Sequence, residues 1–132
     1  MPSQKNTVMI DANVILRYLL RDNQQLYKKA ESLFNEVFSG RQRALIIQPV
    51  IAEVVYVLQK LYKVSREEIA EVLIEFLKMK GVKVQDKDIM LESLEIFRDK
   101  NLDFVDCLLC VYSKEYEVIS FDGGVSRCIK SL

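Results

Sequence analysis

Histidine is missing from this chain of 132 residues. Its absence excludes imidazole general bases, Ser-His catalytic triads and zinc sites with histidine ligands. Glycine and proline are scarce, with 4 and 2 copies, whereas 50% of the residues are hydrophobic. This composition is typical of an ordered, helix-rich protein, and the length fits one domain with its own core. We therefore expect a single domain that spans residues 1–132.

The chain also lacks net charge, because 19 Lys and Arg residues balance 19 Asp and Glu residues. A polyanionic partner would have to be held by a local basic patch or through metal ions. No apolar run approaches the roughly 18 residues that a membrane-spanning helix needs. The first residues also lack the apolar core of a signal peptide. We expect a cytoplasmic protein without a membrane partner.

Cysteine is limited to Cys107, Cys110 and Cys128, an odd number without a recognisable disulfide framework. This favours a reducing compartment. Cys107 and Cys110 form a C-x-x-C pattern, but the pattern lies inside an expected helix and has no second pair of ligands. We interpret these two residues as small buried hydrophobes rather than metal ligands or a redox centre.

Short apolar runs alternate with amphipathic segments along the chain. Strands are expected at residues 8–10, 44–47, 82–84 and 117–121. Helices are expected at residues 13–20, 25–39, 50–62, 66–80, 88–99, 104–116 and 125–129. Strands that are separated by helices need crossover connections, so this order predicts an α/β fold with a parallel sheet and helices on both faces.

Four acids interrupt apolar segments of the sequence. Asp11 and Asp122 each follow an expected strand, at the edge where ligands bind in parallel sheets. Glu53 lies in the expected helix 50–62, and the residues three and four positions away are all uncharged and mainly apolar. A glutamate in such surroundings must be paired, protonated or bound to a cation. Asp106 lies among similar apolar neighbours in the helix 104–116.

Each acid also has a simpler explanation. Asp11 and Asn13 are residue types that commonly form turns and helix caps. Asp122 precedes two glycines and fits an ordinary turn. Asp103 is expected mainly to cap the helix 104–116, and Asp106 would then lie in its first turn, where a negative charge favours the helix dipole. Taken one at a time, these residues leave both explanations open.

Taken together, the four acids predict a specific chemistry if they converge. Four neighbouring carboxylates would repel one another and raise one another's pKa values. A divalent cation relieves that repulsion, and a site made only of oxygen ligands selects Mg²⁺ or Mn²⁺ over zinc. Such a site suits the hydrolysis of phosphodiester bonds, which requires no histidine.

At these residues the sequence resembles the PIN-domain family of metal-dependent ribonucleases, and within it the VapC-like toxins of VapBC toxin–antitoxin pairs. The segment 10–19 is similar to the first family motif, in which the aspartate (here Asp11) is a metal ligand and the asparagine (here Asn13) supports it. Glu53 matches the second acid of the family. The resemblance covers essentially the whole chain.

The two remaining motifs lie near the C-terminus. The run of residues 103–109 is similar to the third motif, whose second aspartate, here Asp106, is the ligand. The tripeptide 120–122 resembles the T-x-D signature of the fourth motif, with Ser120 in the hydroxyl position and Asp122 as the acid. The sequence departs from the family pattern at Ala12, where a hydroxyl residue is common, and at Cys107, where a smaller residue is usual.

The resemblance implies a three-layer α/β/α fold, with a mainly parallel central sheet of four or five strands and about seven helices. It implies an endoribonuclease that uses Mg²⁺ or Mn²⁺, acts on RNA, forms a homodimer and binds a VapB-like antitoxin. The implied catalytic metal ligands are Asp11, Glu53, Asp106 and Asp122, with Asn13, Asp103 and Ser120 in support. Arg17, Arg21 and Arg127 are candidate contacts to RNA or antitoxin, although a solvated face explains them about as well.

Three alternatives stay open at this point. The same fold could serve a housekeeping RNA-processing nuclease that has no antitoxin. It could also serve a module that binds RNA or a protein partner without cutting RNA, although the full set of acids argues against this. A phosphatase or receiver domain is disfavoured, because the segment 11–13 lacks the second carboxylate that such proteins place at one strand end.

Overall fold

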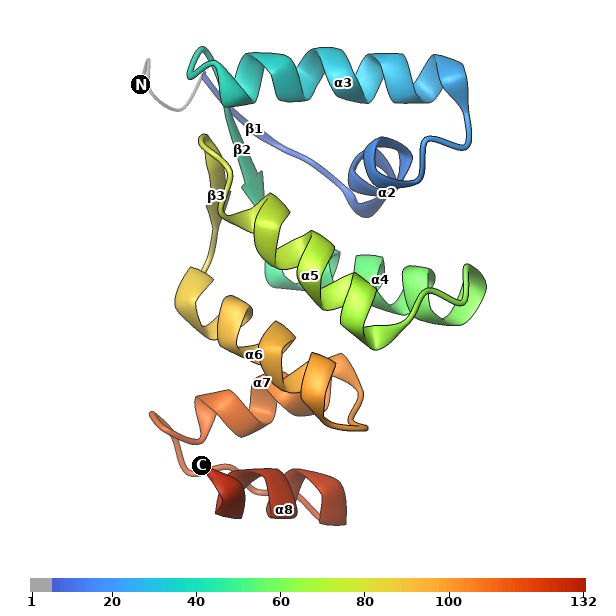
Figure 1. Cartoon of the computed structure of the whole chain (residues 1–132). Helices are drawn as coiled ribbons and strands as arrows, with labels where there is room; N and C mark the ends of the chain where they lie inside the picture. The colour runs from blue at the N-terminus through green and yellow to red at the C-terminus, as the bar shows by residue number, and fades with distance from the viewer. Residues whose placement is uncertain (1–5) are drawn as a thin grey trace. The chain divides into compact units, whose positions relative to one another are not determined.

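A computed structural model describes residues 6–132 and shows a mixed α/β protein (Figure 1). The chain divides into two compact units. The first contains the chain up to Val54 together with Glu75–Gln85, and the second contains Val55–Ile74 together with Asp86–Leu132. The two boundaries fall inside helices α4 (Gln48–Tyr56) and α5 (Arg66–Leu77).

The first unit holds a parallel sheet of three strands in the order β1-β2-β3. Strand β1 (Thr7–Met9) pairs with β2 (Arg43–Ile46), and β2 pairs with β3 (Val82–Val84). Helices α2 (Ala12–Leu20) and α3 (Gln24–Phe38) connect β1 to β2. The predicted parallel sheet is therefore confirmed.

Aromatic rings form the core of the first unit. The ring of Phe34 from α3 is fully buried, with its centroid 4.7 Å from that of Tyr18 and 5.3 Å from that of Phe76. Helix α3 ends where the sequence predicts, because Gly40 adopts a φ of 87° that is costly for residues with a Cβ atom. The contact between Tyr18 and Phe34 joins α2 to α3.

The second unit is helical. It contains the π-helical segment η1 (Val57–Leu61) and helices α6 (Lys87–Asp99), α7 (Phe104–Tyr112) and α8 (Gly123–Ser131). Helix α7 packs against both α6 and α8, so the three helices lie in succession (Figure 1). The residues that form this core are Met90, Leu94, Phe97, Phe104, Leu108, Val111 and Val125.

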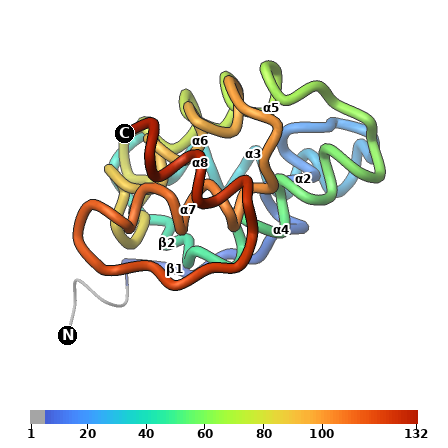
Figure 2. Tube along the Cα trace, turned by 90° about the horizontal axis from the view of Figure 1, so that it is seen from below, coloured from blue at the N-terminus to red at the C-terminus, as the bar shows by residue number. Residues whose placement is uncertain are grey.

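The fourth predicted strand is wrong. Residues 117–121 form no strand, and they belong to a long connection between α7 and α8 that Figure 2 traces as an open arc. Ile119 and Phe121 are exposed, at 79% and 104%. Strand-type residues alone do not form a strand, because the backbone needs a hydrogen-bonded neighbour. The described residues 6–132 thus contain three strands, where the resemblance implies four or five.

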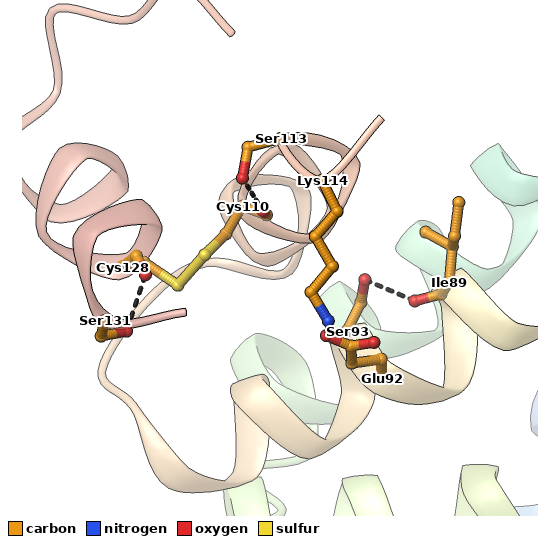
Figure 3. A network of polar contacts seen from close by, with 8 residues as sticks. All are labelled: Ile89, Glu92, Ser93, Cys110, Ser113, Lys114, Cys128 and Ser131. Carbon is orange, nitrogen blue, oxygen red and sulfur yellow. Dashed lines mark hydrogen bonds and ion pairs between the residues drawn. A yellow bond between two sulfur atoms is a disulfide. The ribbon is translucent and has the colours of Figure 1, made fainter. Parts of the chain in front are cut away.

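The expectation that no cysteines pair is also wrong. Cys110 of α7 and Cys128 of α8 form a disulfide, with their Cα atoms 6.0 Å apart (Figure 3). Cys107 is a buried free thiol, as predicted. Burial raises its pKa from the usual value to about 12, which suppresses the reactive thiolate. The two cysteines of the C-x-x-C pattern therefore differ in chemistry, since Cys107 is a free thiol and Cys110 is part of a disulfide.

The remaining predicted helices are present with shifted ends. The helix expected at residues 50–62 is divided into α4 and η1, and the helix expected to reach residue 116 ends at Tyr112. The Oγ atom of Ser65 accepts a hydrogen bond from the backbone N–H of Glu68 at 3.1 Å, which caps the start of α5. None of the helices described over residues 6–132 has the length and apolar character needed to cross a membrane.

Candidate active site

Asp11 lies just beyond the carboxyl end of β1 and caps α2. Its Oδ1 atom accepts a hydrogen bond from the backbone N–H of Val14 at 3.1 Å. The capping explanation is therefore correct for Asp11, but the bond involves only one of the two carboxylate oxygens. Asn13 lies in the first turn of α2, and both residues are exposed to solvent.

Glu53 lies in α4, which begins directly beyond β2. The sequence predicts an acid enclosed by apolar residues, but Glu53 is exposed. The reason is the helical period: Ile51, Val54 and Val55 face the core, while Glu53 and Tyr56 lie on the solvent side. Exposure removes the need for a partner that we inferred from the sequence alone.

Strand pairing relates Asp11 to Glu53 within the first unit. Strands β1 and β2 are parallel neighbours, with Met9 in register with Leu45. The carboxyl ends of adjacent parallel strands meet at the same edge of a sheet. Asp11 and the start of α4 therefore lie beyond the same edge of the sheet. The sequence predicts this edge for Asp11 and Asp122, but within the described residues Asp122 follows no strand.

Asp122 begins α8 in the second unit. Its Oδ2 atom accepts a hydrogen bond from the backbone N–H of Val125 at 3.4 Å. The Oγ atom of Ser120 accepts a hydrogen bond from the backbone N–H of Asp122 at 3.1 Å. Ser120 thus closes a local turn just before the start of α8.

Asp106 is the half-buried acid of the second unit. Its pKa is raised, first by desolvation and then by the negative charges of Asp122 and Asp103. Asp106 and Asp103 belong to the start of α7, whereas Asp122 comes from the start of α8. The fold therefore brings two carboxylates, one from each helix start, within electrostatic reach of Asp106.

Asp103 occupies the N-cap position of α7 but does not act as the predicted cap. Its side chain makes no capping hydrogen bond, and only its backbone carbonyl accepts the N–H of Cys107, at 3.0 Å. The capping role predicted for its carboxylate is therefore wrong. The charge of Asp103 acts instead through space on Asp106.

The candidate arginines differ in their surroundings. The Nη1 atom of Arg17 forms an ion pair with Oδ1 of Asp22 at 2.7 Å, and the guanidinium of Arg21 lies 4.9 Å from the ring centroid of Tyr27. Both side chains are thus engaged within the first unit. Arg127 of α8 is exposed, and its guanidinium lies beside the backbone of Gly123 and Gly124.

Sequence reasoning missed Arg66. Its Nη1 atom donates to the backbone carbonyls of Phe97, Lys100 and Leu102 at 3.1, 2.9 and 2.7 Å, and its guanidinium stacks 4.3 Å from the ring centroid of Phe97. These bonds fix the loop between α6 and α7, which leads directly to Asp103. A signal did exist, because a cation in the first turn opposes the helix dipole and needs another purpose.

Over residues 6–132, no three Asp, Glu or Cys side chains are grouped so that they could hold a metal ion together. The negative charges of Asp122 and Asp103 act on Asp106 without forming such a group. Their chemistry is nevertheless that of a hard, oxygen-only donor set. A bound cation would offset the repulsion that raises the pKa of Asp106.

Residues 8–128 match the PIN domain family. The chain belongs to the PIN-domain family. This match spans nearly the whole described chain and includes all four acids at which the sequence shows the family motifs. The resemblance seen in the sequence is thereby confirmed.

The PIN-domain chain is also similar to a curated relative, the VapC ribonuclease of Aquifex aeolicus (strain VF5). The two sequences are 29% identical over 116 residues, which cover 86% of this chain and 85% of the relative. No solved structure matches the PIN-domain chain. Within the family, its likeness is thus to a VapC protein along most of its length.

Proposed function

We propose that this PIN-domain protein is a metal-dependent endoribonuclease and the toxin of a type II toxin–antitoxin pair. The observation that carries the proposal is that Asp106, in the first turn of α7, lies within electrostatic reach of Asp103 and of Asp122 at the start of α8. All three acids belong to segments that resemble family motifs. The ribonuclease name of the similar VapC protein supports it. Its substrate would be RNA, cleaved at phosphodiester bonds.

In this proposal Asp11, Glu53, Asp106 and Asp122 hold Mg²⁺ or Mn²⁺. When bound, a divalent cation supplies an activated water and neutralises charge on the phosphoryl group. The protein residues hold the ligand oxygens in place. The hydrogen bond from the Val14 backbone N–H to Oδ1 fixes the Asp11 carboxylate, and Oδ2, which takes no part in that bond, would face the cation.

The supporting residues have separate tasks in the proposal. Ser120 orients the backbone of Asp122 through its hydrogen bond. Asn13, in the first turn of α2, would orient the metal ligands or a water beside Asp11. Asp103 adds negative charge beside Asp106, which favours cation binding there.

We further propose that the two units act as one nuclease domain, in a homodimer that binds a VapB-like antitoxin. Exposed large apolar side chains support a protein partner, and Ile119 and Phe121 are among the most exposed in the chain. We propose the cytoplasm as the compartment. The disulfide between Cys110 and Cys128 speaks against the reducing compartment that the cysteine count favours in the sequence, so this proposal rests on the proposed RNA substrate alone.

Calorimetric titration with Mn²⁺ tests the proposal, comparing the wild type with Asp106→Asn. The substitution removes one charge and keeps the side-chain shape, so we expect binding to be lost. Glu71→Gln is the matched control, since Glu71 lies exposed on α5 and outside the family motifs. It should bind as the wild type does.

Cleavage provides the second readout. Digestion of total cellular RNA in Mn²⁺ should be lost in both Asp11→Asn and Asp106→Asn. Unchanged metal-dependent cleavage by Asp11→Asn would contradict the assignment. A wild type that neither binds Mn²⁺ nor cuts RNA would favour a non-catalytic binding module.

A further inference from the structure

A cavity of about 430 Å³ lies within the second unit, between the α6–α7 loop and helix α8. It is lined by Lys100, Asn101, Leu102, Gly124, Arg127 and Cys128. Two of these side chains are cationic, one is an amide and none is acidic. In a chain without net charge, such a site is a local basic patch of the kind that polyanion binding requires.

The two walls of the cavity are held together by close packing. A Cβ atom at Gly124 would lie 2.7 Å from Cδ2 of Leu102, so glycine allows the start of α8 to touch the α6–α7 loop. One turn of α8 beyond Gly124, Cys128 forms the disulfide with Cys110 that joins α8 to α7 (Figure 3). The cavity is therefore built into the packing of the unit and needs no ligand to form it.

Arg66 fixes the backbone of the loop wall. It donates hydrogen bonds to the carbonyls of Lys100 and Leu102, on either side of Asn101. The loop that carries Lys100 and Asn101 is thus preorganised, which lowers the entropy lost on binding. Because Lys100, Asn101 and Arg127 are exposed, their polar ends are accessible to a ligand.

The cavity adjoins the proposed acidic site. The Oδ2 atom of Asp122 lies 3.4 Å from the position of a Cβ atom on Gly124, which lines the cavity. Cations on one side and carboxylates on the other match a phosphodiester chain, in which one phosphate faces basic groups and the next faces a cation bound by acids.

Resting on the proposed function, we propose that this cavity binds a phosphate of the RNA strand next to the phosphate that is cleaved. Lys100 and Arg127 supply the charge, and Asn101 supplies an amide donor. The site carries no sequence information, because backbone phosphates are the same in every RNA. It sets the register of the strand against the acids.

The test measures binding of a fluorescent single-stranded oligouridylate by anisotropy, in EDTA, as a function of salt. Each phosphate contact contributes about 0.7 to the slope of log affinity against log salt for single strands. The double variant with Lys100→Gln and Arg127→Gln should lose this one contact and lower that slope by about 0.7, and each single variant should weaken binding about two- to five-fold. Arg127→Lys keeps the charge and should keep the slope.

Lys60→Gln is the matched control, because Lys60 is an exposed cation of the same unit that does not line the cavity. It should leave the slope unchanged. In wild-type protein the amide resonances of Asn101 and Gly124 should shift when oligouridylate is added. This second readout does not depend on any variant.

The outcomes distinguish failure of the phosphate site from failure of the nuclease assignment. If the wild type binds and cuts RNA but the Lys100 and Arg127 variants behave as Lys60→Gln does, the phosphate site is refuted and the nuclease assignment stands. If the wild type binds no RNA and cuts none in Mn²⁺, both are refuted.

Discussion

The two units hold their candidate acids in different ways. In the first unit Asp11 caps a helix and Glu53 stands exposed on another, each placed by its own secondary-structure element. In the second unit Asp103, Asp106 and Asp122 come from two helix starts, and the charges of Asp122 and Asp103 raise the pKa of Asp106. The second arrangement depends on tertiary packing, so it should be the more sensitive to changes away from the acids.

Three contacts maintain that packing in the second unit: the disulfide, the hydrogen bonds of Arg66, and the contact between Gly124 and Leu102. None has an equivalent role for Asp11, whose position follows from β1 and the start of α2. Disturbing these contacts therefore tests whether the difference between the units is real.

Reduction of the disulfide should have the largest effect. Cys110 and Cys128 are 18 residues apart, and closing a loop of that length stabilises a fold by about 3 kcal/mol. Melting followed by circular dichroism should show a lower Tm in a reducing agent. A variant with both Cys110→Ser and Cys128→Ser should show no response to the reductant.

Thiol titration of the denatured protein checks the premise directly. The chain has 3 cysteines, of which only Cys107 is free in the oxidised protein. Its thiol should be the only one that reacts before reduction, and it should resist alkylation in the native state because its pKa is about 12. Three reactive thiols before reduction would contradict the disulfide.

Loss of Arg66 should have the next largest effect. Arg66→Ala removes three hydrogen bonds to carbonyls and the stacking on Phe97, and we expect a loss of about 2 kcal/mol in the free energy of unfolding. Urea titration measures this loss. Arg66→Lys should recover only part of it, since an ammonium lacks the planar guanidinium that stacks on the ring. Full recovery by lysine would show that charge alone matters.

Substitution of Gly124 should have a smaller effect, with Gly123 as its control. Gly124→Ala places a Cβ atom 2.7 Å from Leu102 Cδ2, an overpacked contact that should outweigh the helix propensity gained and destabilise the fold by about 1 kcal/mol. Gly123→Ala meets only the flexible end of Arg127 at 3.1 Å, so it should be neutral or stabilising. Equal stability of the two variants would mean that the contact with Leu102 is not tight.

The contrast between the units also explains what the sequence could predict. The three strands of the sheet and the acids that follow strands or begin helices were found, because periodicity and capping are local signals. The exposure of Glu53 could also have been found, since Ile51, Val54 and Val55 define the buried side of its helix. Apolar neighbours in the sequence do not bury a helical residue; its place in the helical period decides which side of the helix it lies on.

The partners of Arg66 and Cys128 could not be found from local signals. Arg66 donates to carbonyls that are 31 to 36 residues away along the chain. Cys110 could pair with either of two other cysteines, and no local pattern indicates Cys128. Residues 117–121 have strand-type composition, yet composition does not supply a pairing neighbour. Contacts between distant segments are decided by tertiary packing, which a single sequence does not encode in a short pattern.

Substitution of single acids in the absence of metal should have the smallest effect on the free energy of unfolding. In EDTA at neutral pH, Asp106→Asn should raise the free energy of unfolding by about a few tenths of a kcal/mol, because it removes a half-buried charge that Asp122 and Asp103 repel and solvent screens. Glu53→Gln removes an exposed charge and should change nothing measurable.

Because the pKa of Asp106 is raised in the folded state, its ionised form is the destabilising one. The advantage of Asp106→Asn should therefore shrink as the pH falls through that raised pKa, and vanish below the ordinary aspartate value. An equal gain from Glu53→Gln would mean that the two units do not differ in how they hold their acids.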